Sequence, residues 1–131
     1  MGFRKPVIVE EPIGSDTKWT LHESFTYDFL KSGINCVITV PMGFKTDFAS
    51  IPRIFWTILH PTGKGRGAAV IHDYLYSVRG LYDPSTAPLT RKESDRLFLA
   101  ALKELDVSWV KRFTMWRAVR RFGWISYPKA R

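Results

Sequence analysis

The sequence predicts an α+β fold, in which a small N-terminal antiparallel β-sheet or hairpin precedes a layer of three to four helices. Two patterns predict it. Between residues 19 and 40 apolar side chains alternate with polar ones, whereas after residue 66 they recur every three or four residues. At 131 residues, we expect one domain over 1–131, with a β-rich part at 1–52 and a helical part at 53–131.

The β-rich part is predicted to contain a hairpin. One face of the first strand, residues 19–29, is apolar except at Glu23 and carries Trp19, Leu21, Phe25, Tyr27 and Phe29. Residues 30–33 form the turn, and the second strand runs from residue 34 to Pro41, which lacks the N–H that a strand ladder needs. A further short strand is expected at residues 7–9.

Four segments of the second part have helical patterns. A short helix is expected at 53–59, and a second at 67–78 follows the glycine-rich basic loop 63–67. Thr90 and Glu93 have the spacing of a capping box, which predicts a third helix from there to about residue 105. The last helix spans about 108–122, and residues 79–89 read as a connecting loop.

The composition describes a globular, basic chain. The net charge is +8, and the whole excess lies in residues 61–131, which hold fourteen basic and six acidic side chains. No apolar run has the length of a transmembrane segment, and the first residues lack the apolar core of a signal peptide. The single cysteine, Cys36, cannot form an intrachain disulfide, which favours a cytosolic location or delivery by something other than a signal peptide.

Residues 72–76, His-Asp-Tyr-Leu-Tyr, form the most informative motif. At about 100° per residue, His72, Asp73 and Tyr76 share one flank of their helix. Asp95 lies on the apolar face of the next helix, so an antiparallel helix pair would bring it to His72. A carboxylate on one imidazole nitrogen fixes the tautomer and leaves the other nitrogen as a general base for water. The tyrosine hydroxyl would steady Asp95.

Two more carboxylates suggest a metal. Asp73 lies beside the histidine, and Asp47 precedes it in a polar loop, so both are candidate oxygen ligands. Such ligands suit Ca²⁺ or another hard divalent cation better than zinc. The alternative is structural: Asp95 pairs with Arg91, Arg79 or His72 and joins two helices without catalysis.

The His72-Asp73-x-x-Tyr76 motif, followed by Asp95 and Phe98 on the next helix, resembles phospholipase A2, above all its short bacterial and viral forms. The resemblance covers about 30 residues. It implies that His72 activates water, that Asp95 orients His72, and that Asp73 binds calcium in hydrolysis of a phospholipid. The calcium loop and the disulfides of secreted members have no clear counterpart here.

A second resemblance spans about half the chain. Residues 43–53, Gly-Phe-Lys-Thr-Asp-Phe-Ala-Ser-Ile-Pro-Arg, and residues 68–76 resemble the GFxTDxASxPR and AAxxHDxLY motifs of a phage- and prophage-borne family of domains of unknown function. It implies a bacteriophage origin, in the host cytoplasm or the virion, and groups Asp47 with His72. The His-Asp metal phosphohydrolases share the A-A-x-x-H-D helix, but they need an upstream histidine ligand, and their all-helical domain disagrees with the β-rich half.

The C-terminal segment is basic and aromatic. Residues 107–131 contain seven lysines and arginines and no acid, with Trp, Phe and Tyr interleaved. Arg117, Arg120 and Arg121 are candidates for binding nucleic acid or another anionic surface. The favoured interpretation is structural, with Trp109, Phe113 and Trp116 in the core. No nucleic-acid-binding motif is recognisable, so nucleic acid is the least supported partner.

The sequence therefore predicts two alternative functions. The first is a bacteriophage accessory protein with a hydrolase-like His/Asp site, a divalent-metal-dependent enzyme acting on a phospholipid or other ester. The second is a non-catalytic virion, tail or assembly protein that contacts phage structural proteins and uses the His/Asp cluster for helix packing.

Overall fold

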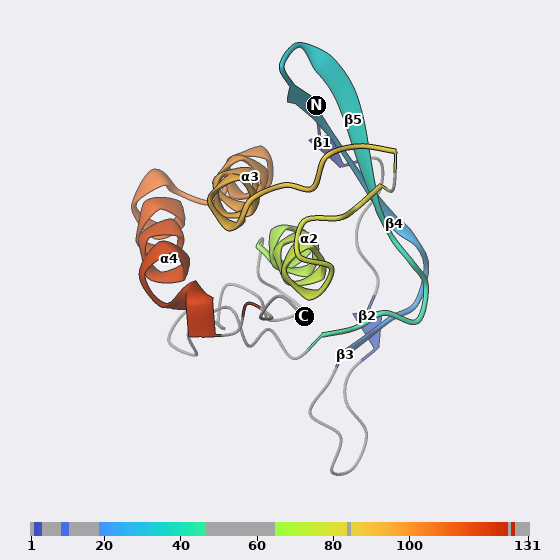
Figure 1. Cartoon of the computed structure of the whole chain (residues 1–131). Coiled ribbons are helices and arrows are strands. Elements are labelled where there is room, and N and C mark those ends of the chain that lie inside the picture. The colour runs from blue at the N-terminus through green and yellow to red at the C-terminus, as the bar shows by residue number, and fades with distance from the viewer. Residues whose placement is uncertain are drawn as a thin grey trace. The chain divides into compact units, whose positions relative to one another are not determined.

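The structure is a computed structural model that describes residues 2–3, 9–10, 19–46, 65–83, 85–125 and 127. Antiparallel strands in two small sheets are followed by helices, so the predicted α+β class is confirmed (Figure 1). The chain divides into two compact units, residues Met1–Asp47 and Phe48–Arg131. The single domain remains a prediction. The expected helix at 53–59, residues 63–64 of the glycine-rich loop and Asp47 lie outside the described residues.

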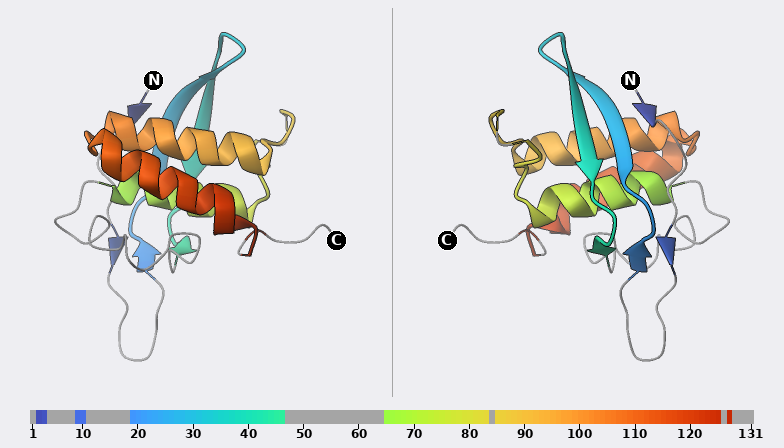
Figure 2. Two further views of the ribbon diagram at one scale, coloured as in Figure 1. Left: turned by 90° about the vertical axis from the view of Figure 1, so that its left-hand side faces the viewer. Right: turned by 90° about the vertical axis from the view of Figure 1, so that its right-hand side faces the viewer.

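The first sheet contains the predicted hairpin. Its strands are β1 (Gly2–Phe3), β4 (Phe25–Lys31) and β5 (Ile34–Val40), antiparallel in the order β1-β4-β5 (Figure 2). A two-residue turn joins β4 to β5, and both of its residues, Ser32 and Gly33, have positive φ values of 53° and 78°. This is the primed turn whose twist matches that of paired strands. Tyr27 and Ile38, paired across the hairpin, are fully buried.

The second sheet consists of β2 (Val9–Glu10), β3 (Trp19–Leu21) and β6 (Lys45–Thr46), in the order β2-β3-β6. The single strand expected over residues 19–29 is wrong, because a bend at residues 22–24 separates β3 from β4. In an unbroken strand Glu23 would share a face with the buried Leu21 and Phe25, and burying that carboxylate would be costly. The bend leaves Glu23 exposed.

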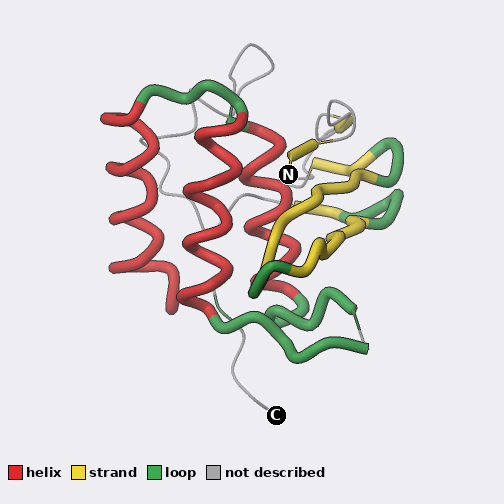
Figure 3. The backbone as a smooth tube through the Cα atoms, turned by 90° about the horizontal axis from the view of Figure 1, so that it is seen from above, coloured by secondary structure: helices red, strands yellow, loops and turns green. Residues whose placement is uncertain are grey.

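The helices described in the second unit are α2 (Arg66–Ser77), α3 (Arg91–Glu104) and α4 (Trp109–Phe122), followed by the short 3-10 helix η2 (Gly123–Ile125). They run alongside one another, and α3 contacts both α2 and α4 (Figure 3). None of the helices in the described ranges combines the length and apolarity that crossing a bilayer requires.

Gly80 holds the connection from α2 to α3 together through two backbone hydrogen bonds. Its φ is 80°, its N–H donates to the Leu75 carbonyl over 2.8 Å, and its carbonyl accepts from the Leu89 N–H over 3.0 Å. A Cβ at this position would lie 1.9 Å from the Leu89 carbonyl oxygen, so only glycine fits both the conformation and the space. The connection brings the last turn of α2 beside the first turn of α3.

The inward face of α4 differs from the expectation. Its buried residues are Met115 and Val119, whereas Trp109 is 65% exposed and Phe113 is 43% exposed. The prediction that these two aromatic residues belong to the core is wrong. Residues four positions apart make only a narrow stripe, which suffices for a helix whose principal helical neighbour is α3.

The first turn of α3 is fixed by the predicted capping box. The Glu93 N–H donates to the Thr90 hydroxyl over 3.1 Å, and the Thr90 N–H donates to the Glu93 carboxylate over 3.0 Å. Both bonds satisfy donors that the helix itself leaves without a partner.

We expect Thr90→Ala to lower the free energy of unfolding by about 1 kcal/mol, because the hydroxyl that accepts the Glu93 N–H is lost. Urea denaturation measures the change. Thr90→Ser keeps the acceptor and is the control. Equal losses in the two variants would contradict the capping role.

Candidate functional site

Three residues of the predicted site meet between α2 and α3. His72 Nε2 lies 2.7 Å from Oδ1 of Asp95, and the Tyr76 hydroxyl donates to the same oxygen over 2.5 Å. His72 and Tyr76 are one helical turn apart on α2, so both reach the carboxylate from one flank. The structure thus brings together the residues that the helix spacing placed on facing sides.

Two arginines contact the other oxygen of the Asp95 carboxylate, Oδ2. Arg120 of α4 donates from Nη1 to Oδ2 of Asp95 over 2.8 Å, and Arg91 of α3 approaches the same oxygen at 3.5 Å. Asp95 therefore receives donors from α2, α3 and α4. We call His72, Tyr76, Arg91, Asp95 and Arg120 the Asp95 cluster.

Arg91 also binds the end of α4. Its guanidinium donates to the carbonyls of Val119 at 3.2 Å and Arg120 at 3.3 Å. The Val119 carbonyl also accepts from the Gly123 N–H, and carbonyls at the end of a helix carry partial negative charge, so a cation there stabilises the helix end. One arginine thus joins the start of α3 to the end of α4.

The centre of the Asp95 cluster is sealed from solvent. Both His72 and Asp95 are 0% exposed, whereas the side chains of Arg91 and Arg120 are 23% and 28% exposed. The imidazole lies against the rings of Tyr76 and Phe98, with centroids 4.2 Å and 4.7 Å away. The charges are therefore paired at the interior end and hydrated at the outer end, which limits the cost of burying them.

The chemistry of Asp95 fixes the proton positions around it. A carboxylate accepts from the His72 ring when the ring proton is on Nε2, the nitrogen that lies next to Asp95. Burial, together with the hydrogen bond to Asp95 and its charge, raises the pKa of Tyr76 far above its usual range, while Arg91 acts in the opposite sense. Tyr76 therefore remains a donor.

A close approach completes the packing around Tyr76. Gly123, the first residue of η2, has helical backbone angles, but a Cβ there would lie 2.5 Å from the Tyr76 hydroxyl and 3.2 Å from Arg91 Nη1. The glycine is therefore needed for space and not for its φ. Tyr127 packs edge-on against Tyr76, with ring centroids 4.9 Å apart.

The proposed metal ligands are only partly described. Asp73 is half-buried on α2, next to His72 in the sequence, and Asp47 lies outside the described residues. Within the described ranges, no three His, Cys, Asp or Glu side chains are grouped closely enough to hold an ion. The calcium site at Asp47 and Asp73 stays a prediction.

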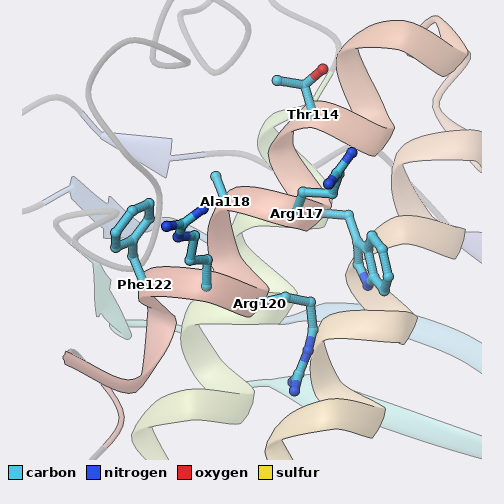
Figure 4. Close-up of a pocket in the computed structure, with 7 residues that line it drawn as sticks. Thr114, Arg117, Ala118, Arg120 and Phe122 are labelled. Carbon is cyan, nitrogen blue, oxygen red and sulfur yellow. The ribbon is translucent and has the colours of Figure 1, made fainter.

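The three arginines proposed for anionic surfaces separate into two groups. Arg117 and Arg121 are exposed on α4. Arg120 is bound to Asp95 and belongs to the cluster, although it also lines the pocket on α4 shown in Figure 4. Their role in binding an anionic surface stays a prediction.

Sequence reasoning missed the contributions of Arg120 and Gly123. Arg91 precedes Asp95 by four residues, a spacing that already named it as a candidate partner, and the structure shows this pair. Arg79, another candidate, instead lies over the Tyr127 ring at 5.8 Å. No local pattern marks Arg120 or Gly123, because the residues they contact are far away in the sequence. Arg120 binds Asp95, about 25 positions before it, and Gly123 lies against Tyr76, about 47 positions before it.

We expect the stability that the Tyr76 hydroxyl contributes to depend on alkaline pH. The folded-state pKa is raised, so this stability is fully present below about pH 10, the pKa of the unfolded chain, and is lost as the pH rises toward the folded value. The free energy of unfolding of the wild type should exceed that of Tyr76→Phe, and this difference should shrink by roughly 1 kcal/mol between pH 10 and 11.

Urea denaturation at pH 8, 10 and 11 measures this difference. Tyr74→Phe is the control, because residue 74 faces away from residues 72 and 76 at about 100° per residue. A difference that stays constant over this pH range would show that the Tyr76 proton is not held by the fold.

Gly123→Ala should lower the free energy of unfolding by about 1–3 kcal/mol, although alanine normally favours a helical conformation, because the new Cβ collides with the Tyr76 hydroxyl. Tyr76→Phe removes the colliding oxygen. The double variant should therefore lose less than the sum of the single losses. Additive losses in urea denaturation would contradict the collision.

The comparisons with known proteins place the chain in a family without assigning it an activity. Neither the curated proteins nor the solved structures contain a match to this chain. The family model described as "Protein of unknown function (DUF1353)" matches residues 19–119, which include the hairpin, α2, α3 and most of α4. Since that is well over half of its length, the chain belongs to the DUF1353 family.

Proposed function

We propose that the protein is an ester hydrolase in which the His72–Asp95 pair activates water. One observation carries the proposal: His72 Nε2 lies 2.7 Å from an Asp95 oxygen that also accepts the Tyr76 hydroxyl. The carboxylate orients the ring, stabilises the imidazolium and leaves Nδ1 as the base. The resemblance of residues 72–76 and 95 to phospholipase A2 supports the same roles.

The proposed reaction needs only water and the ester as reactants. Nδ1 of His72 takes a proton from water while the oxygen attacks the ester carbonyl. The tetrahedral intermediate then expels the alcohol, which takes the proton back from the imidazolium. Asp95 keeps the ring in place throughout, and the hydrogen bond from the Tyr76 hydroxyl holds the Asp95 carboxylate in position. Calcium dependence stays a prediction from the resemblance.

The proposed biological setting is a bacteriophage or prophage, with the protein in the host cytoplasm or the virion. The support is the resemblance of residues 43–53 and 68–76 to the motifs of a phage-borne family. A phospholipid or another carboxylic ester is the substrate class we propose.

A second candidate function is favoured by the burial of the site. His72 and Asp95 are 0% exposed, and Arg120 pairs with the carboxylate at 2.8 Å. In this alternative the Asp95 cluster is a non-catalytic junction between helices in a virion, tail or assembly protein. The two functions differ in one requirement: a general base must meet water, whereas a structural histidine need not.

The hydrolase predicts that fluorogenic phospholipid and simple ester substrates are cleaved, and that His72→Gln lowers kcat at least about 100-fold, the scale of general-base catalysis. Glu104→Gln, an exposed acid on α3, is the control and should keep full activity. Parallel assays with CaCl2 and with a chelator test the metal, and calorimetric titration with Ca²⁺ tests binding to wild type and Asp73→Asn.

Modification by diethyl pyrocarbonate, located by mass spectrometry, separates the two candidates without a known substrate. A base that meets water reacts at His72 in the folded protein. In the helix junction His72 reacts only on unfolding, and purified protein cleaves no ester. That pair of results would overturn the hydrolase proposal.

A further inference from the structure

The outer side of α4 exposes large apolar side chains near both ends of the helix. In its first turns Trp109 is 65% exposed, and Val110 and Phe113 are exposed with it. Past the end of the helix Trp124 is 64% exposed. Isolated apolar side chains are ordinary on protein surfaces, but a group rich in tryptophan and phenylalanine on one helix marks a surface for a partner.

Basic side chains lie between these apolar groups. Arg117 and Arg121 are exposed and one helical turn apart, so they extend from the same side of α4. They line an open pocket of about 770 Å³ together with Trp116 and Phe122 (Figure 4). The Arg121 guanidinium lies 5.7 Å from the centre of the Phe122 ring. Among the described residues, no carboxylate pairs with either arginine.

The charge of the surrounding sequence defines the partner. Residues 107–131 include Lys111, Arg112, Arg117, Arg120 and Arg121 among their basic residues and contain no Asp or Glu. A partner that fits this segment carries dense negative charge and accepts apolar side chains. A second copy of the same surface would repel it, because both would be positive.

We propose that this face of α4 binds the surface of an anionic phospholipid bilayer. The α4 surface consists of Trp109, Val110, Phe113, Arg117 and Arg121, of which the residues at 109, 113, 117 and 121 follow one another at a spacing of four. The aromatic and aliphatic side chains would enter the headgroup boundary, where tryptophan is favoured, while the arginines bind the lipid phosphates. Nucleic acid also offers phosphates, but the aliphatic side chain of Val110, which is 56% exposed, suits a hydrocarbon boundary better than stacked bases.

This inference does not rest on the proposed hydrolase. Binding to vesicles depends on α4, whereas hydrolysis depends on His72. The variant His72→Gln should therefore bind vesicles like wild type. Arg120 is left unchanged in every test because it holds Asp95.

The test is cosedimentation of the purified protein with vesicles of phosphatidylglycerol or of phosphatidylcholine. We expect binding to phosphatidylglycerol, weak binding to phosphatidylcholine, and a shift of tryptophan emission to shorter wavelength on the anionic vesicles. Arg117→Glu with Arg121→Glu should weaken binding more than about tenfold. The matched control is Arg96→Glu with Lys103→Glu, which makes the same charge change at exposed positions on α3 and should bind nearly as wild type.

A second variant tests the apolar side chains. Trp109→Ser with Phe113→Ser keeps every charge and changes two exposed positions, so it should fold and yet bind phosphatidylglycerol vesicles several-fold more weakly. Equal loss in the α4 and α3 charge variants would show that only net charge matters and would overturn the proposal. So would binding to single-stranded or duplex DNA without binding to vesicles.

Discussion

The carboxylate of Asp95 is the constraint on which the arrangement of the helices depends. It is fully buried and accepts hydrogen bonds from His72 and Tyr76 of α2 and from Arg120 of α4, while it belongs to α3 itself. A buried charge without these donors would cost several kcal/mol, so each helix must present its donor at the right position and angle. Gly80 and Gly123 supply the close approaches that allow it.

An arrangement of this kind is not the most stable way to fill a core. Well-packed apolar side chains of similar volume often stabilise a protein as much as a buried ionic cluster or more, so the cluster suits specificity or chemistry better than stability alone. The geometry serves both purposes, because the contacts that orient His72 also fix how α2 faces α3. The orientation of the His72 ring therefore supports the hydrolase, whereas the burial of the same ring supports the structural junction between helices.

Local signals in the sequence predicted the parts of the fold that depend on local physics. The Ser32-Gly33 turn, the Thr90 capping box and the facing of His72 toward Asp95 each follow from residue spacing within one or two elements. The break before Phe25 was marked only by Glu23. The inward side of α4 and the pairing of Arg120 with Asp95 depend on how a third helix packs. The aromatic spacing of Trp109, Phe113 and Trp116 predicted a different inward side from the one that Met115 and Val119 form.

The hydrogen bonds from Arg91 to the last carbonyls of α4 also affect how the second unit unfolds locally. Arg91 and Arg120 connect the start of α3 to the end of α4, and Tyr76 connects both to α2. Fraying of the α4 end therefore leaves a buried carboxylate short of a donor, which makes the frayed state costly. Backbone amides of α2, α3 and α4 should consequently exchange with solvent deuterium through a shared opening, as one cooperative unit, and not helix by helix.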